Sequence, residues 1–213
     1  NDPSKVLVIE KDNNLIKLLK NKFNTNIEII NKDVLKVRED TLSDKILTVY
    51  GNLPYNIATE ILIKWILGIS KKKVWFDYLV LMFQKEVADR IISKINSSNY
   101  GRLGIFLNWK MDIKKVFDIS PNCFYPKPKI HSTLLHFIPK NNYLKVKESK
   151  NLEKITRIFF NQKRKKIKNP LKQLFPNYRE VSKKLKLDLN LRPQNLSLNT
   201  YCSIVKEYEK LIN

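Results

Sequence analysis

The sequence predicts an α/β fold, in which a doubly wound sheet domain is followed by a small domain made only of helices. Between residues 6 and 138, short apolar runs typical of buried strands alternate with segments of helical spacing. Beyond residue 150 only helical spacing remains. A chain of 213 residues is long enough to bury a core in such an arrangement.

The order of the expected elements gives the domain boundaries. Val6-Leu7-Val8-Ile9-Glu10 is a β-branched run that ends in an acid, as a strand of a parallel sheet would. Further strands are expected at 27–30, 46–50, 78–83, 113–119 and 132–138, and helices at 15–23, 57–66, 86–95, 103–109, 151–169, 178–187 and 199–211. The sheet domain is therefore expected to span 1–140, a polar linker 141–150 and the helical domain 151–213.

The charge balance is strongly basic and favours a polyanionic partner. Forty-one Lys and Arg residues oppose twenty Asp and Glu, which gives a formal net charge of +21. Lys, Asn and Ile are all abundant, so a nucleotide bias of the gene is an alternative source of the charge. Because no apolar run reaches the ~18 residues of a membrane span, a soluble cytoplasmic protein is expected. The two cysteines lack metal-ligand spacing, and no metal is expected.

Polar residues follow three of the expected strands. Glu10 ends the first strand, Asp33 comes just after the second, and Asn52 to Tyr55 follow the third. In an open α/β sheet, ligands sit at the carboxyl ends of the strands. We therefore expect these residues to converge on one crevice. A tyrosine in such a turn requires a partner for its ring.

The turn carries a recognisable motif. Gly51-Asn52-Leu53-Pro54-Tyr55-Asn56-Ile57 resembles the Asn-Leu-Pro-Tyr motif of the rRNA adenine N6,N6-dimethyltransferase family. Further segments resemble that family in the same order along nearly the whole chain: 83–90, 100–103, 124–132, 161–169 and 194–197. The resemblance implies a Rossmann-like methyltransferase sheet followed by a helical RNA-binding domain, and an enzyme that dimethylates two adjacent adenines near the 3′ end of small-subunit (16S) rRNA during ribosome biogenesis.

The chemistry of adenine methylation suits this turn. The exocyclic N6 is a poor nucleophile because its lone pair is delocalised into the ring. The side-chain oxygen of Asn52 and the backbone carbonyl of Leu53 can each accept one N6 hydrogen, which favours a pyramidal nitrogen. Pro54 fixes the turn and adds no competing donor. Tyr55 offers its ring face to the base, and the resemblance places Phe124 at the opposite or flanking wall.

The resemblance also implies S-adenosylmethionine as the methyl donor. Glu10 would then accept hydrogen bonds from the ribose hydroxyls, Asp33 would accept one from the cofactor's adenine amine, and Asn52 would border both ligands. Family members place a glycine-rich turn before the strand that ends in the acid. The four glycines of this chain lie elsewhere, at positions 51, 68, 101 and 104. We therefore expect a fragment that lacks a central strand, and its cofactor affinity is left open.

A basic segment marks the expected RNA contact. Lys163, Arg164, Lys165, Lys166 and Lys168 are expected on a helix that opens the second domain. A charge run is ordinarily a solvated face, but next to an RNA-modifying crevice phosphate contact is the better interpretation. For Lys71-Lys72-Lys73 the two interpretations are balanced. The expected partner is small-subunit rRNA in a pre-ribosomal particle. The sequence carries no oligomer signal, and a monomer is expected.

Two other functions stay open at this stage. A resistance methylase that acts on large-subunit rRNA shares the turn and the Phe-Pro-Lys segment. Such relatives usually carry Ile at the position of Leu53, so the sequence favours the small-subunit enzyme. A non-catalytic nucleic-acid-binding factor on the same fold is the second alternative. Glu10, Asp33, Asn52 and Tyr55 argue against it.

Overall fold

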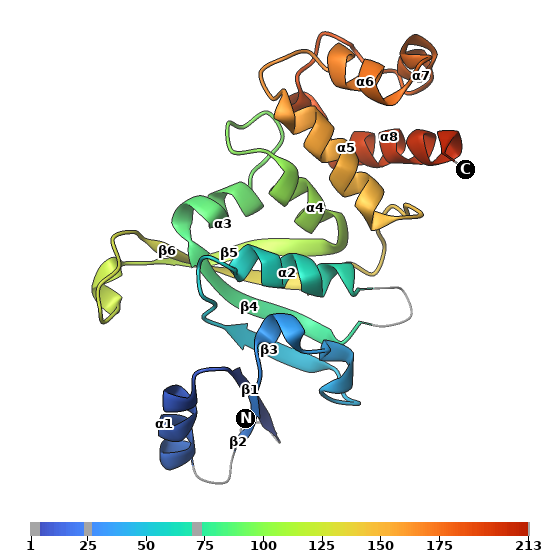
Figure 1. The fold of residues 1–213 in the computed structure, drawn as a ribbon. Coiled ribbons are helices and arrows are strands. Elements are labelled where there is room, and N and C mark those ends of the chain that lie inside the picture. Colours follow the sequence, from blue (N-terminus) through green and yellow to red (C-terminus); the bar gives the residue numbers. More distant parts are fainter. Residues whose placement is uncertain (1–4, 24–26, 70–73, 213) are drawn as a thin grey trace.

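The computed structural model describes residues 5–23, 27–69 and 74–212. The strands are β1 (Val6–Glu10), β2 (Ile27–Asn31), β3 (Leu47–Gly51), β4 (Phe76–Gln84), β5 (Met111–Ile119) and β6 (Ser132–Pro139). The α-helices are α1 (Asn13–Phe23), α2 (Ala58–Leu67), α3 (Lys85–Ile91), α4 (Arg102–Lys110), α5 (Ser149–Asn161), α6 (Lys168–Leu174), α7 (Tyr178–Lys184) and α8 (Leu198–Leu211). The expected α/β class with a helical C-terminal part is confirmed (Figure 1).

The strands form two sheets. β1 and β2 pair in parallel, and the larger sheet has the order β3-β4-β6-β5. β3 and β4 are parallel, while β6 runs antiparallel to β4 and β5. No ladder joins β1 to β3 within the described ranges. The small sheet therefore depends on contacts other than strand pairing for its position.

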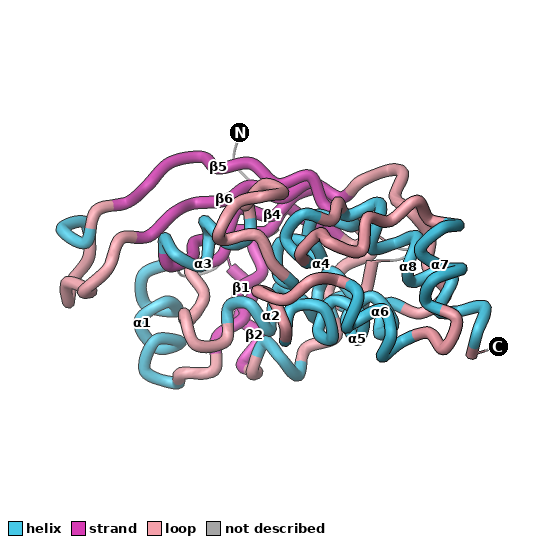
Figure 2. The backbone as a smooth tube through the Cα atoms, turned by 90° about the horizontal axis from the view of Figure 1, so that it is seen from above, coloured by secondary structure: helices cyan, strands magenta, loops and turns pink. Residues whose placement is uncertain are grey.

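One hydrophobic core runs through the sheet and the helical part. Figure 2 shows α2 and α4 on the same side of the larger sheet. Phe83 and Phe137 of that sheet are fully buried, as are Phe159 of α5 and Tyr201 of α8, and all four belong to a single buried cluster. The division into two domains at 141–150 stays a prediction, but the two parts are packed together.

The polar segment between the two parts is held at both ends. The indole Nε1 of Trp109 donates to the carbonyl of Leu144 at 2.7 Å. The carboxylate of Glu209, from the last turns of α8, accepts from the backbone N–H groups of Lys147 and Glu148, both at 3.0 Å. These bonds lower the pKa of Glu209, although burial opposes them as the largest single influence. The expected linker is thus fixed against both parts.

Lys163, Arg164, Lys165 and Lys166 do not lie on a helix, so that expectation is wrong for these four residues, whereas Lys168 is the first residue of α6. α5 ends at Asn161, because Gln162 leaves the helical region with φ −119° and ψ 41°. The chain then turns, with the N–H of Lys165 donating to the carbonyl of Gln162, and the N–H of Ile167 is tied to the carbonyl of Leu191 at 2.8 Å. The segment 162–167 therefore forms a loop between α5 and α6.

No helix in the described ranges combines the length and the apolar character that a membrane crossing requires.

The close approach of α3 and α4 depends on Gly104. A Cβ atom built there would lie 2.9 Å from the carbonyl oxygen of Arg90, which belongs to the backbone of α3 and cannot move aside alone. We predict that Gly104→Ala lowers the free energy of unfolding by about 1–3 kcal/mol, measured by urea denaturation.

Gly68→Ala is the matched control. Gly68 has helical angles, φ −67° and ψ −16°, and an added Cβ would meet only ordinary contacts, the nearest at 3.4 Å. Equal stability, or a gain of up to about 1 kcal/mol, is expected there. If both variants lost the same free energy of unfolding, the close approach of α3 and α4 would not be the cause of the loss in Gly104→Ala.

Candidate active site

Glu10 is placed at the end of β1 with one carboxylate oxygen still available. It pairs in register with Asn31 at the end of β2. Its Oε1 accepts from the backbone N–H groups of Lys11 at 2.7 Å and Asp12 at 2.8 Å. Its Oε2 has no hydrogen-bond partner within the described ranges. The side chain is half-buried, so the free oxygen is an acceptor at the carboxyl edge of the small sheet.

Asp33 lies beside this edge, two residues beyond β2. Its Oδ1 accepts from the backbone N–H of Leu35 at 3.0 Å and caps the short 3₁₀ turn Val34–Lys36. Its Oδ2 lies 3.5 Å from the ammonium of Lys11. The Leu35 bond first, and then Lys11, lower the pKa of Asp33. The carboxylate is therefore ionised at neutral pH, and Lys11 links the loops that carry Glu10 and Asp33.

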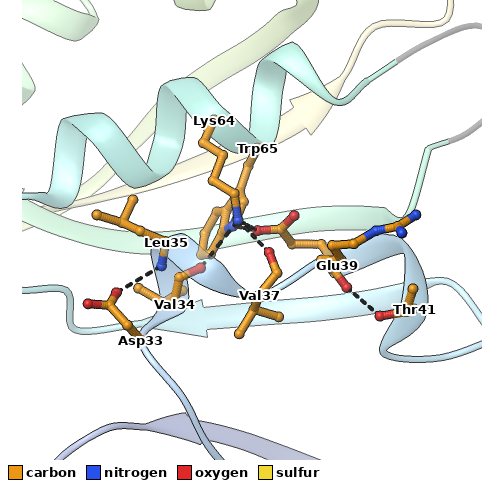
Figure 3. Close-up of polar contacts among 9 residues, drawn as sticks. Asp33, Val34, Leu35, Val37, Glu39, Thr41, Lys64 and Trp65 are labelled. Carbon is orange, nitrogen blue, oxygen red and sulfur yellow. Dashed lines mark hydrogen bonds and ion pairs between the residues drawn. The ribbon is translucent and has the colours of Figure 1, made fainter.

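The segment after Asp33 is fastened to α2 by a polar cluster (Figure 3). The ammonium of Lys64 donates to the carbonyls of Val34 at 3.3 Å and Val37 at 2.5 Å, and it pairs with the carboxylate of Glu39. The indole Nε1 of Trp65 donates to the same carboxylate at 2.9 Å. Sequence reasoning assigned no role to Lys64. A lysine on the apolar face of the expected helix was the available signal.

The Asn52–Tyr55 turn links β3 to α2. Gly51 is packed so closely that a Cβ would lie 2.8 Å from the side chain of Leu81. Asn52 is exposed, and its side chain has no hydrogen-bond partner in the described part of the chain. The carbonyl of Pro54 accepts from the N–H of Ile57 at 3.1 Å, which closes the turn. The amide of Asn52 is thus available to a ligand.

Tyr55 is held by a residue that sequence reasoning did not single out. Its hydroxyl lies 2.6 Å from the Oγ of Ser132, the first residue of β6. Phe124 follows the short 3₁₀ turn Pro121–Cys123, is half-buried, and lies on the segment that leads into Ser132. No ring contact joins Phe124 to Tyr55 among the residues with described positions. The structure therefore brings Tyr55 to β6, while Phe124 stands apart.

Glu10 and Asp33 are joined by the β1–β2 ladder, in which Glu10 pairs with Asn31, and by the ion pair of Lys11 with Asp33. No hydrogen bond or ion pair connects either acid to the Asn52–Tyr55 turn within the described ranges. The two halves of the candidate site are connected by the Lys64 cluster and by the packing of Val34, Leu35 and Leu53 against the core.

The basic segment is divided by its contacts. Lys163 donates to the carbonyl of Ser98 at 2.5 Å, and Lys166 donates to the Oδ1 of Asn190 at 2.8 Å. Arg164, Lys165 and Lys168 are exposed, and their side chains have no partner in the described ranges. Lys71, Lys72 and Lys73 lie outside the described residues.

A cleft of about 630 Å³ lies between the sheet domain and α5. It is lined from Thr59 at the start of α2, across Arg90 and Arg102, to Phe160 near the end of α5 and Lys163 in the loop that follows. Arg102 is 3.8 Å from Glu153, and Arg90 has no ion-pair partner among the described residues. None of the residues from Asn52 to Tyr55 lines this cleft.

Comparison with known proteins agrees with this arrangement. Residues 3–210 match the sequence model of the family described as ribosomal RNA adenine dimethylase. This chain belongs to that family. Among curated dimethylases it is 61% identical, over 209 residues, to the ribosomal RNA small subunit methyltransferase A of Pelagibacter ubique (strain HTCC1062), covering 98% of this chain and 79% of the relative. It is 38% identical to the protein of the same name from Wolbachia sp. subsp. Drosophila simulans (strain wRi), covering 99% of this chain and 77% of the relative.

Solved structures of similar fold include a dimethyladenosine transferase from Plasmodium falciparum. The TM-score is 0.76 at 26% identity, with 97% of this chain and 82% of that chain covered. The 23S rRNA methyltransferase ErmE matches with a TM-score of 0.67 at 19% identity, covering 98% of this chain and 82% of that chain. The second likeness shows the dimethylase fold alone.

The Lys64 cluster generates a prediction. Lys64→Met should lower the free energy of unfolding by about 1–3 kcal/mol, because it leaves the carboxylate of Glu39 without its cation and two carbonyls without a donor. The side chain of Glu39 is only 14% exposed, so water replaces that cation poorly. Urea denaturation measures the loss. Amide exchange at Leu35 and Val37 should accelerate as well.

Lys94→Met serves as the control, since Lys94 is exposed and its side chain has no partner in the described part of the chain. A change within about 0.5 kcal/mol is expected there. Unaltered exchange at Leu35 in Lys64→Met would contradict the role given to the cluster.

Proposed function

We propose that this chain transfers methyl groups from S-adenosylmethionine to N6 of two adjacent adenines near the 3′ end of small-subunit rRNA. The observation that carries the proposal is the Asn52-Leu53-Pro54-Tyr55 turn at the carboxyl end of β3, in a chain that matches the dimethylase family over residues 3–210. The named relatives at 61% and 38% identity are small subunit methyltransferases, which favours this substrate over large-subunit rRNA.

The turn positions the amine. The exposed amide oxygen of Asn52 and the carbonyl of Leu53 accept the two N6 hydrogens, so the nitrogen lone pair is directed away from the ring. Tyr55 stacks on the base, which contributes about 1–3 kcal/mol in single-strand binders. No shifted general base is required, because the amine becomes acidic only as its new bond to carbon forms. Rate acceleration comes mainly from positioning. Phe124 is assigned to the second wall of the adenine pocket.

The acids at the small sheet fit the nucleoside end of the cofactor. When bound, S-adenosylmethionine supplies a methyl group activated as a sulfonium. Glu10 offers a free Oε2 to the ribose hydroxyls, and the ionised Asp33 can accept from the adenine amine, both as charge-assisted bonds. Asn52 borders cofactor and substrate. No glycine-rich turn for the methionine end lies among the described residues.

The substrate adenines must be unpaired or extruded, because N6 is inaccessible inside a duplex. Arg164, Lys165 and Lys168 are free to contact phosphates beside the site, and the net charge of +21 supports such contacts. We assign the rRNA of a pre-ribosomal particle as the partner and a monomer as the acting form. The alternative function, a non-catalytic binding factor, would give the exposed amide of Asn52 no role.

The proposal is tested by radiolabelled methyl transfer to undermethylated small ribosomal subunits, followed by mapping of the modified bases. Label in two adjacent adenines of small-subunit rRNA is expected. Label in large-subunit rRNA in a parallel reaction would favour the resistance methylase, and label in neither would favour the binding factor.

Asn52→Ala should lower methyl transfer by about 100-fold or more, because the amine is no longer oriented. The dissociation constant for RNA should stay within about twofold, since phosphate contacts supply most of the affinity. Asn141→Ala, an exposed asparagine outside the site, is the control and should be fully active. Equal losses of binding and catalysis in Asn52→Ala would make the residue structural.

Replacing Arg164, Lys165 and Lys168 together by Gln should reduce the salt dependence of RNA binding. Each phosphate contact contributes about 0.7–0.9 to the slope of log K against log salt, so a decrease of about 2–3 is expected. The control replaces Lys17, Lys20 and Lys94, which removes the same charge from other exposed positions. If both triple variants showed the same slope, the segment would be a solvated surface that does not contact the RNA.

A further inference from the structure

We propose that Ser132 is a positioning residue for adenine methylation, which it assists by fixing the ring of Tyr55 against the incoming base. The inference rests on the proposed function. The observation behind it is the 2.6 Å contact between the hydroxyl of Tyr55 and the Oγ of Ser132, two residues separated by 77 positions in the sequence.

The contact crosses the carboxyl edge of the larger sheet. β4 lies between β3 and β6, and the last residue of β4, Gln84, pairs with Ser132. Tyr55 follows β3, so its side chain spans the end of β4 to reach Ser132. The ring is therefore held at the backbone of the turn and again at its hydroxyl. This edge is also where Asn52 presents its free amide.

Ser132 is a rigid anchor. It is fully buried and lies in ladders with β4 on one side and β5 on the other, where it pairs with Ile119. The preceding residue, His131, accepts the backbone N–H of Lys85 at 2.9 Å, which ties the start of β6 to the start of α3. Because Ser132 is held by β4, by β5 and through the neighbouring His131, its hydroxyl has a fixed position and so fixes the hydroxyl of Tyr55.

Fixing the hydroxyl removes one of the two side-chain freedoms of the tyrosine. A bond at the hydroxyl holds χ1 and therefore the position of the long axis of the ring, while rotation about χ2 leaves the hydroxyl in place. Stacking requires the ring to stand beside the base, and the alignment of the amine with the methyl donor depends in turn on the stacked base. Ser132 touches neither reactant in this scheme and acts through Tyr55.

The scheme predicts a specific pattern of kinetics. Ser132→Ala and Tyr55→Phe should each lower kcat by about 3- to 10-fold, the loss expected from one hydrogen bond. The double variant should lose no more than either single variant, because both remove the same bond. KM for the small ribosomal subunit should stay within about twofold. Tyr55→Ala should lose more than Tyr55→Phe, since it removes the stacking ring as well.

Thr133→Val is the matched control. Thr133 is the next residue of β6, is also fully buried, and donates its hydroxyl to the Oδ1 of Asp118 at 2.6 Å. Its replacement removes a buried hydroxyl at a neighbouring position without touching Tyr55. Thermal unfolding of every variant reports any structural cost, and Thr133→Val should keep wild-type kcat even where its stability falls.

Each outcome decides between the two proposals. Absence of methyl transfer from the wild-type protein would remove the proposed function itself. Active wild-type protein with Ser132→Ala within twofold of it would overturn the positioning role. Multiplicative losses in the double variant would overturn it too, because they would assign the two hydroxyls separate tasks. Equal and non-additive losses would support it.

Discussion

The attachment of the segment after Asp33 to α2 depends on one half-buried cation, Lys64. β1 and β2 share no ladder with the larger sheet within the described ranges, so strand pairing does not fix Glu10 and Asp33 relative to the Asn52–Tyr55 turn. The ammonium of Lys64 contributes to their placement, because it binds two carbonyls and a carboxylate from the segment that follows Asp33, and Val34 and Leu35 of that segment pack against the core. Lys64 belongs to the helix that starts directly after the turn. The segment after Asp33 and the Asn52–Tyr55 turn are therefore both attached to α2.

The fold class, the strands and the polar strand ends could be predicted from sequence because each rests on local signals. Val6 to Glu10 reads as a buried strand without knowledge of its neighbours, and the Asn52–Tyr55 motif is contiguous. The Lys64 cluster and the Tyr55–Ser132 bond could not be predicted, since they join residues far apart in sequence. The break between α5 and α6 was also missed. It depends on the bond from Ile167 to Leu191, which no local pattern around Lys163 reveals.

The positive charge has two different uses in the molecule. Lys64, Lys163 and the buried Lys110 donate to backbone carbonyls of other elements and so work as internal ties. Burial lowers the pKa of Lys110, whose ammonium contacts the carbonyls of Ile66 and Ile69 and the rings of Trp109 and Tyr143. The side chains of Arg164, Lys165 and Lys168 make no such hydrogen bond within the described ranges. Net charge alone therefore overstates the surface that is free for a polyanion, and contacts decide which cations remain available.

The single core that joins the sheet domain to the helical part has a geometric consequence. Lys163 is bonded across to Ser98, and Arg164, Lys165 and Lys168 follow on the same segment, so the core constrains how far these cations lie from the Asn52–Tyr55 turn. Under the proposed function, an RNA held at these cations would present to Asn52 and Tyr55 only nucleotides within a limited distance along its path. Two adjacent adenines would then reach the turn one after the other through a shift of the RNA by one nucleotide.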